Sequence, residues 1–438
     1  MLKKLRIKNF KSWKDTGEID LAPITMFFGG NSSGKTSLLQ FILMLKQTAE
    51  ISDYSSQILK FNGIVNLGNF KDVVFDHDKK NAIEFSISKD AEFFIRERFF
   101  PLEISGFRAI IAEESSKIKI EDFEITNPTY SKKDPKKDPK KKGVTIFDPS
   151  QFLQEITRDL KNHKNSKDDD GIKKEDFVVR KIWRNTVLYP FISRVEYIGP
   201  LRKQPERDYP WNNNHPTEMG AAGEFAIQAI IASNLQKGDL ENDVAKALKK
   251  MGLIDSFKVK PLSEDSDERY KVLVKKTKGS TEVLLPDVGF GVSQILPILT
   301  ALYNSKAGAV ILLEQPEIHL HPKAQIELAD IIVDAVKRRK IQVIIESHSE
   351  HFLTRIQTRV ADGEISKNST KLYFCKNEKG FSELEELKLS DSGDIENWPE
   401  NFFGNQLEES ANRILSYLER KKLKKEEFLK CQKKSPKN

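Results

Sequence analysis

The sequence predicts a mixed α/β fold, and three observations lead to this prediction. Residues 24–28 form a short apolar run, a glycine-rich turn follows, and residues 35–50 then show helical periodicity with good helix formers. A second apolar run, 309–314, ends in a carboxylate, and a helical pattern at 322–338 separates it from a third apolar run, 342–347. Strands that alternate with helices in this way are typical of α/β folds.

The remaining elements are expected from local patterns. Residues 2–10 alternate apolar and basic side chains, as in a strand with one face in water. Strand-like patterns also occur at 83–125, 257–260 and 270–276, and helical patterns at 149–163, 174–194, 223–235, 241–250 and 293–303. We find no internal repeat.

Composition places the chain among globular proteins. Its 438 residues exceed the ~150 residues of a typical domain, so we expect one large domain with an elaboration, or two domains. Hydrophobic residues make up 38% and charged residues 31%, which still permits a buried core and excludes wholesale disorder. Two distant cysteines exclude a disulfide framework and a thiolate zinc cluster. Because no apolar run approaches ~18 residues, we expect a cytoplasmic protein without a membrane span or signal peptide.

The net charge of +7 comes from two segments. Residues 132–142 carry seven Lys and two Asp, and residues 420–438 carry nine Lys or Arg and two Glu. The rest of the chain is therefore acidic. A solvated loop and a tail are the preferred explanation for both segments, and contact with the phosphate backbone of nucleic acid is the alternative. The first segment contains no aromatic residue and the second contains Phe428 alone, so base stacking is not indicated.

Residues 29–36 match the pattern GxxxxGK[ST], between a predicted strand and a predicted helix, as that motif requires. Glycines allow backbone N–H groups to surround phosphates, and the helix N-terminus adds positive charge. Lys35 would reach the β- and γ-phosphates, and the hydroxyl of Thr36 would bind Mg²⁺. The candidate nucleotide-binding residues are Gly29, Asn31, Ser32, Ser33, Gly34, Lys35, Thr36 and Ser37.

The strand 309–314 ends at Glu314, and Gln315 and Glu317 follow. A P-loop site needs a strand of this kind, which presents a carboxylate to the water shell of Mg²⁺. A core strand that ends in an acidic loop is the ordinary alternative for this pattern alone. Its combination with the P-loop favours Glu314 as a metal-site carboxylate.

Between these motifs, Gly289, Gly291 and Ser293 precede a predicted helix, where Ser293 could simply be its N-cap. Four of the seven histidines fall within 319–351, so a transition-metal site must be weighed. The two histidines of HLHP, however, are spaced i, i+2 and would not share a helix face. His348, directly after the strand 342–347, would suit the sensing of a γ-phosphate equally well.

The order of P-loop, GFGVSQ, ILLEQPEIHLHP and IIESHSEHFL resembles the ABC-type ATPase heads of the SMC, RecF and OLD-like families. The segment 398–403, WPENFF, is similar to a C-terminal segment of bacterial AAA ATPases associated with antiphage defence, such as those of the PARIS and Septu systems. The resemblance implies an ATPase head with mixed sheets and an inserted arm. Its expected parts are an N-lobe at 1–75, an arm at 76–195, a C-lobe at 196–404 and a basic helical tail at 405–438.

The resemblance also implies ATP and Mg²⁺ as cofactors and a role for each motif. Lys35 and Thr36 would bind nucleotide and Mg²⁺, Glu314 would be the Walker B carboxylate, and His348 the switch histidine. Gly289, Gly291 and Ser293 would touch the γ-phosphate bound by a second protomer.

The sequence departs from this family at Gln315, where a glutamate usually polarises the attacking water. An amide can orient water but cannot accept its proton. Either Glu317 acts as the base or hydrolysis is slow, and slow hydrolysis would suit a switch. Gln47 and Gln57 are candidates for the Q-loop glutamine.

The function implied by the resemblance is an ATPase sensor or scaffold in bacterial antiphage defence. It would form a homodimer or higher homo-oligomer and would hold or activate a separate effector protein, a nuclease. The residues after His348 contain no HNH pattern, and Asp391 and Asp394 are spaced DxxD rather than DxD. A RecF- or SMC-like DNA-binding ATPase of DNA repair is the alternative, and the energising subunit of a transporter fits less well.

Overall fold

The structure, a computed structural model, describes residues 1–51, 59–78, 80–89, 95–97, 100–112, 117–126, 188–213, 215–263, 266–377 and 379–399. The chain divides into two compact units, Met1–Glu396 and Asn397–Asn438. Several predictions lie outside the described residues: the helix at 149–163, most of the helix at 174–194, both basic segments, Gln57 and the end of WPENFF. Within the described residues, no helix has the length and apolar character needed to cross a bilayer.

A six-stranded sheet in the first unit positions the predicted motifs. Its strand order is β17-β16-β4-β15-β14-β9, and all pairs are parallel except β16 with β17. The strands are β4 (Ile24–Gly29), β9 (Val195–Ile198), β14 (Val310–Glu314), β15 (Gln342–Glu346), β16 (Thr370–Lys376) and β17 (Glu383–Leu387). Glu346 lies between Phe27 and Glu314 in register. The P-loop strand and both acidic strands therefore end at one edge, where open α/β sheets bind ligands.

A seven-stranded sheet, antiparallel in every pairing, contains the N-terminal strand. It comprises β1 (Leu2–Phe10), β2 (Trp13–Asp15), β3 (Ile19–Asp20), β5 (Ile83–Lys89), β6 (Ile95–Glu97), β7 (Phe100–Ala112) and β8 (Lys117–Thr126). The strand predictions for 2–10 and 83–125 are confirmed, because alternating patterns mark strands with one buried face.

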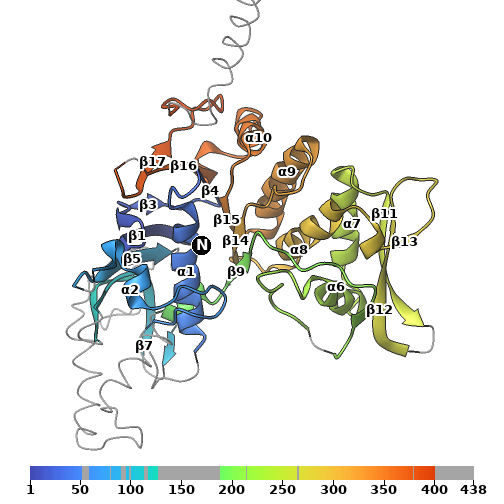
Figure 1. Cartoon of the computed structure of the whole chain (residues 1–438), viewed down its shortest axis with the longest axis horizontal. Coiled ribbons are helices and arrows are strands. Elements are labelled where there is room, and N and C mark those ends of the chain that lie inside the picture. The colour runs from blue at the N-terminus through green and yellow to red at the C-terminus, as the bar shows by residue number, and fades with distance from the viewer. Residues whose placement is uncertain are drawn as a thin grey trace, which may run out of the picture. The chain divides into compact units, whose positions relative to one another are not determined.

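Helix α1 (Lys35–Ala49) lies within the core that joins these two sheets (Figure 1). The Phe41 ring makes edge-to-face contacts with Phe10 and Phe85 of the antiparallel sheet, both at 5.1 Å between ring centroids. Residues of β14, β15 and β16 belong to the same core. A helix that is apolar around most of its circumference needs such enclosure on several sides. The helix that begins in the P-loop is therefore held firmly by both sheets.

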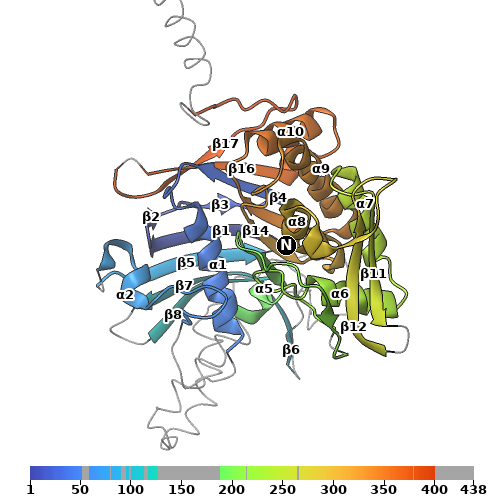
Figure 2. The ribbon, with the colours of Figure 1, turned by 45° about the vertical axis from the view of Figure 1, so that its right-hand side comes forward.

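Helices cover the rest of the six-stranded sheet, and a small third sheet lies on the side away from β1 and β5 (Figure 2). The helices are α6 (Ala226–Leu235), α7 (Leu240–Lys250), α8 (Phe290–Asn304), α9 (Pro322–Arg339) and α10 (Glu350–Ala361), with short α2 (Phe70–Val73) and α5 (Tyr189–Ile192). The third sheet contains β10 (Tyr209–Pro210), β11 (Ser256–Ser263), β12 (Ser266–Lys275) and β13 (Val283–Leu284). The prediction of a mixed α/β fold with several sheets is confirmed.

The structure corrects the predicted start of the helix at 293–303, which is α8. It begins at Phe290 and not at Ser293, because Gly289 adopts the extended conformation of an N-cap residue. Gly291 and Ser293 therefore lie in the first turn of the helix.

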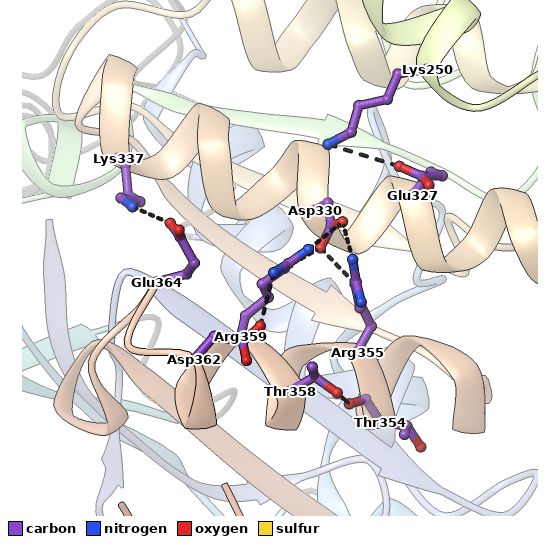
Figure 3. Close-up of polar contacts among 10 residues, drawn as sticks. All are labelled: Lys250, Glu327, Asp330, Lys337, Thr354, Arg355, Thr358, Arg359, Asp362 and Glu364. Carbon is purple, nitrogen blue, oxygen red and sulfur yellow. Dashed lines mark hydrogen bonds and ion pairs between the residues drawn. The ribbon is translucent and has the colours of Figure 1, made fainter. Parts of the chain in front are cut away.

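A cluster of ionic hydrogen bonds joins α9 to α10 (Figure 3). The Asp330 carboxylate, 6% exposed, accepts hydrogen bonds of 2.6–2.9 Å from the guanidinium groups of Arg355 and Arg359. Burial raises the pKa of Asp330, but the two arginines outweigh burial and lower it to about 2. Because α10 begins at Glu350, two residues after His348, this cluster fixes the helix that follows the predicted switch histidine.

Asp330→Asn should lower the free energy of unfolding by about 2–4 kcal/mol near neutral pH, because it leaves two partly buried arginines without their carboxylate. The folded-state pKa is depressed, so the wild-type contribution is present above the unfolded pKa of 3.8 and is lost as pH falls toward about 2. Urea denaturation at pH 7 and near pH 2 measures the difference, which should shrink in acid. Asp334→Asn, in an exposed pair with Arg338 on α9, should cost less than ~0.5 kcal/mol. Equal losses in both variants would contradict a special role for Asp330.

Candidate functional site

The P-loop needs its glycines because of its backbone conformation. Gly29 and Gly34 have φ values of 142° and 95°, which disfavour residues with a Cβ. A Cβ at Gly29 would overlap the Cys375 carbonyl of neighbouring β16, and one at Gly34 would overlap the Ser382 hydroxyl. The tight turn between β4 and α1 therefore depends on these two glycines.

Lys35 lies inside this turn and is 3% exposed. Its Nζ donates hydrogen bonds to the Gly29 and Gly30 carbonyls at 3.1 and 2.7 Å. Burial lowers the pKa of Lys35, opposed by Glu346, Cys375 and Glu317. An ammonium group so enclosed can act on phosphate groups that replace the carbonyls as partners.

The other predicted P-loop residues line the same turn. Asn31 and Ser32 are exposed, Ser33 is buried, and the Ser37 N–H donates to the Gly34 carbonyl at 3.1 Å. The exposed side of the loop is therefore available to a nucleotide.

Thr36 contacts a carboxylate that sequence reasoning missed. Its Oγ1 donates a 2.8 Å hydrogen bond to Oε1 of Glu346, at the end of β15. Burial raises the pKa of Glu346 to about 7, and the charges of Glu314 and Glu317 add to this effect. In the third apolar run Glu346 directly follows the apolar residues, as Glu314 does in the second, and this signal could have identified Glu346.

Glu314 lies one strand farther from the P-loop and has its own partners. Its Oε2 accepts a 2.6 Å hydrogen bond from the Tyr197 hydroxyl. Burial raises the pKa of Glu314, opposed by Tyr197 and then by Arg202. Gln315 follows with a left-handed φ of 45°, and its N–H donates to the Glu346 carbonyl at 2.9 Å. The loop after β14 is thus tied to the end of β15.

Glu317 holds the loop that carries His348. Its Oε1 accepts hydrogen bonds from the Ser347 hydroxyl at 2.8 Å and the His348 N–H at 2.7 Å. Burial raises the pKa of Glu317. The His348 side chain is exposed, and its pKa is lowered by partial burial and by the charge of Lys35. The structure therefore gives Glu317 an anchoring contact and brings His348 within the electrostatic reach of Lys35.

Arg202 is a second residue that sequence reasoning missed, and it lies in a loop that matches no motif. It is 7% exposed, and its Nη2 donates to the carbonyls of Glu314 and Gln315 at 3.4 and 3.3 Å. Burial lowers its pKa to about 10, although Glu317, Tyr197 and Glu314 favour the charged form. Within the described part of the chain, its Nε and Nη1 find no hydrogen-bond partner. A buried cation thus lies beneath the loop after β14.

The segment Gly289–Ser293 contacts the loop after β14. The exposed Phe290 ring packs edge-on against His319 at 5.0 Å between centroids, and Gly291 lies beside the His319 carbonyl. Ser293 is 7% exposed and donates its hydroxyl to the Phe290 carbonyl. The exposed part of this segment therefore consists of Gly289 and Phe290, with Gly291 partly exposed.

The four late histidines have separate surroundings. His321 caps α9 by accepting from the Lys323 N–H, while His319 contacts Phe290. His348 lies in the loop that Glu317 holds, and His351 lies on α10. Across the ranges that the structure describes, no group of three or more His, Cys, Asp or Glu side chains could hold a metal ion.

Gln47, a Q-loop candidate, lies twelve residues along α1 from Lys35, about 18 Å at the rise of an α-helix. Its side chain donates to the Lys60 carbonyl and accepts from the Val65 N–H. Gln47 therefore stabilises the loop around residues 60–65 and does not reach the phosphate site.

A cavity of about 690 Å³ lies elsewhere, beside the start of β9 and the end of α8. Its lining includes Glu196, Glu218 and Ser305 but no P-loop residue. Since the motif residues converge at the opposite ends of the strands, the candidate nucleotide site is at the P-loop and not in this cavity.

Comparison with known proteins agrees with this geometry. A family model described as "AAA domain, putative AbiEii toxin, Type IV TA system" matches residues 24–354, and one described as "Protein of unknown function (DUF3696)" matches residues 365–412. An OLD nuclease of Thermus scotoductus (strain ATCC 700910 / SA-01) is 22% identical over 365 residues, which cover 80% of this chain and 60% of that protein. The chain thus spans less than two thirds of that relative.

Solved SMC heads are also similar. An SMC head bound to the C-winged helix domain of ScpA aligns with a TM-score of 0.45 and 13% identity, covering 89% of this chain and 98% of that one. The SMC head domain from Thermotoga maritima aligns with a TM-score of 0.41 and 10% identity, covering 88% and 99%.

The first family model extends from the P-loop strand β4, through Glu314 and His348, into α10, and so covers well over half of the chain. This chain belongs to the AAA-domain family described as a putative AbiEii toxin of type IV toxin–antitoxin systems, a family of P-loop ATPase domains.

Proposed function

We propose that this protein binds ATP with Mg²⁺, hydrolyses it slowly, and serves in bacterial antiphage defence as a sensor or scaffold for a separate effector, a nuclease. One observation carries the proposal. Lys35 and Thr36 lie at the sheet edge where Glu314 and Glu346 end neighbouring strands, and Gln315 takes the position after the strand-ending carboxylate.

The residues at this edge can each contribute to ATP binding. Lys35 and the backbone N–H groups of the P-loop would hold the phosphates, and Thr36 with a neighbouring carboxylate would hold Mg²⁺. Bound Mg²⁺ would neutralise charge that develops on the transferred phosphoryl group. Gln315 would orient water without accepting its proton. Because Glu317 already accepts two hydrogen bonds from the 347–348 loop, we expect turnover suited to a switch and not to a motor.

Two features support the effector role. The related OLD protein is named a nuclease, and the family is described as a putative toxin. The C-terminal WPENFF segment resembles defence-associated ATPases, which adds to the same proposal. A homodimer or higher homo-oligomer would place Gly289–Gly291 of one protomer against the ATP of another.

A native pull-down tests this function. The tagged chain would be isolated from its own host with a slowly hydrolysed ATP analogue and Mg²⁺, or with EDTA, and analysed by mass spectrometry and by nuclease assay of the eluate. We expect a stoichiometric partner with nuclease activity whose retention depends on nucleotide. Salt-sensitive DNA in place of a protein partner would favour the RecF- or SMC-like alternative.

A further inference from the structure

The cavity beside the start of β9 contains a buried carboxylate that lacks a full set of hydrogen-bond donors. Glu196, on β9, lines this cavity of about 690 Å³ and is 6% exposed. Its Oε1 lies 3.1 Å from the Ser305 hydroxyl, but that hydroxyl has a single hydrogen and also lies 2.7 Å from the Ala301 carbonyl. Within the described residues, Oε2 of Glu196 has no hydrogen-bond partner. A carboxylate buried in this way is costly unless a donor or a cation enters the cavity beside it.

The charges around Glu196 do not compensate its negative charge. Burial raises the pKa of Glu196 to about 7, and the charge of Glu218 adds to this effect, while Ser305 and Lys46 oppose it. Lys46 is already engaged, because its Nζ pairs with Glu218 at 2.5 Å and with Glu50 at 2.8 Å. Glu218 lines the same cavity. The buried part of the cavity therefore favours a positively charged group.

Cationic side chains line the exposed part of the same cavity. Arg194, next to the start of β9, and Lys306, in the turn after α8, both line the cavity and are exposed. Arg194 reaches this turn, since its Nη1 donates to the Ala307 carbonyl at 3.2 Å. An anionic group would be attracted to these two side chains, whereas a cation would be attracted to Glu196. The cavity thus offers opposite charges in its buried and exposed parts.

We propose that this cavity binds a small zwitterionic molecule, with a guanidinium or ammonium group against Glu196 and an anionic group beside Arg194 and Lys306. Small-molecule sites usually have volumes of roughly 300–1,000 Å³, a range that includes this cavity. The residues that line it include none from the P-loop. The proposed site is therefore separate from the nucleotide site, and the inference does not rest on ATP binding.

Binding of L-arginine, followed by saturation-transfer difference NMR, tests the placement of the cationic group. L-Arginine carries both a guanidinium group and a carboxylate, and we expect the wild-type chain to bind it with a Kd below ~10 mM. Glu196→Gln should weaken this binding at least ~10-fold, because a charge-assisted hydrogen bond in a buried place is lost. The matched control is Glu364→Gln, which neutralises an exposed carboxylate outside the cavity lining. It should leave the Kd within about twofold of wild type.

A second comparison tests the placement of the anionic group. Agmatine keeps the guanidinium group of L-arginine but lacks the carboxylate, so it should bind the wild-type chain about 2- to 5-fold more weakly, as expected for exposed ion pairs. The double variant Arg194→Gln, Lys306→Gln should bind both compounds with similar affinity. Because both replaced residues are exposed, this variant is expected to fold even if Glu196→Gln does not, and thermal unfolding checks each variant.

Four results would overturn the proposal. The first is no binding of L-arginine to the wild-type chain at ~10 mM. The second is wild-type affinity in a folded Glu196→Gln variant, and the third is equal affinity of the wild-type chain for agmatine and L-arginine. The fourth is displacement of L-arginine by excess ATP with Mg²⁺, which would show that the probe occupies the nucleotide site. Weaker binding in Glu196→Gln, unchanged binding in Glu364→Gln and no displacement by ATP would support it.

Discussion

Lys35→Ala should reduce ATP turnover at least ~100-fold, the usual cost of losing a preorganised donor to developing charge. Lys35 is the side-chain cation enclosed by the P-loop, where its Nζ contacts the Gly29 and Gly30 carbonyls. Burial makes its charge effective at short range, because little water screens it. Phosphate release from ATP, measured with purified variant and wild type, gives the ratio directly.

Gln315→Glu serves as the control, because ATP turnover is expected to change in the opposite direction. Gln315→Glu supplies a carboxylate in the usual base position and should raise turnover if Gln315 orients the attacking water. Glu317→Gln should stop turnover only if Glu317 is the base. Thermal unfolding of each variant checks the fold. Wild-type turnover in Lys35→Ala would reject the site, whatever the other two variants do.

Mixing two inactive variants should restore activity if ATP is bound between protomers. Gly289→Trp is the second variant, because the Gly289 Cβ would meet no atom within 4 Å and its φ of −57° suits any residue. The protomer should therefore tolerate the tryptophan, which would block only a partner's nucleotide. Each variant alone should lose most turnover, since every site then contains one damaged half. In a mixed dimer both lesions fall in one site and the other site is intact.

The expected recovery of turnover follows from the fraction of mixed dimers. Random exchange of equal amounts gives about half mixed dimers, each with one intact site, so recovery should approach one quarter of wild-type turnover if one site suffices. Wild type mixed with Lys35→Ala shows whether one site suffices. Gly279→Trp, at an equally open and exposed glycine in the loop after β12, controls for an added surface tryptophan. No recovery despite proven exchange and an active control mixture would falsify the composite site.

The surroundings of Ser293 in the structure explain why Gly289, and not Ser293, is the residue to replace in this experiment. The family resemblance implies that Ser293 touches the γ-phosphate of a second protomer, but its hydroxyl donates to the Phe290 carbonyl within α8, and the residue is buried. A bulky residue there would disturb the helix before it touched a partner. Gly289 lies at the exposed start of the same helix, so a bulky residue there would meet a partner without disturbing the helix.

The sequence alone was sufficient for the features that depend on neighbouring residues. The strand, glycine turn and helix around Lys35 were predicted because periodicity, glycine and helix propensity act over a few residues. The same is true of the apolar strand that ends at Glu314 and of the alternating strand at 2–10. The mixed α/β class followed from the order of these elements.

Only the tertiary structure decided which side chains meet at the sheet edge. Thr36 and Glu346 are 310 residues apart, and their contact follows from the pairing of β15 with β4. The buried position of Arg202 and the contact of Glu317 with the 347–348 loop arise in the same way. Sequence patterns report which residues form strands, but strand order is set by packing of the whole sheet against its helices. That order determines which carboxylate lies beside the P-loop.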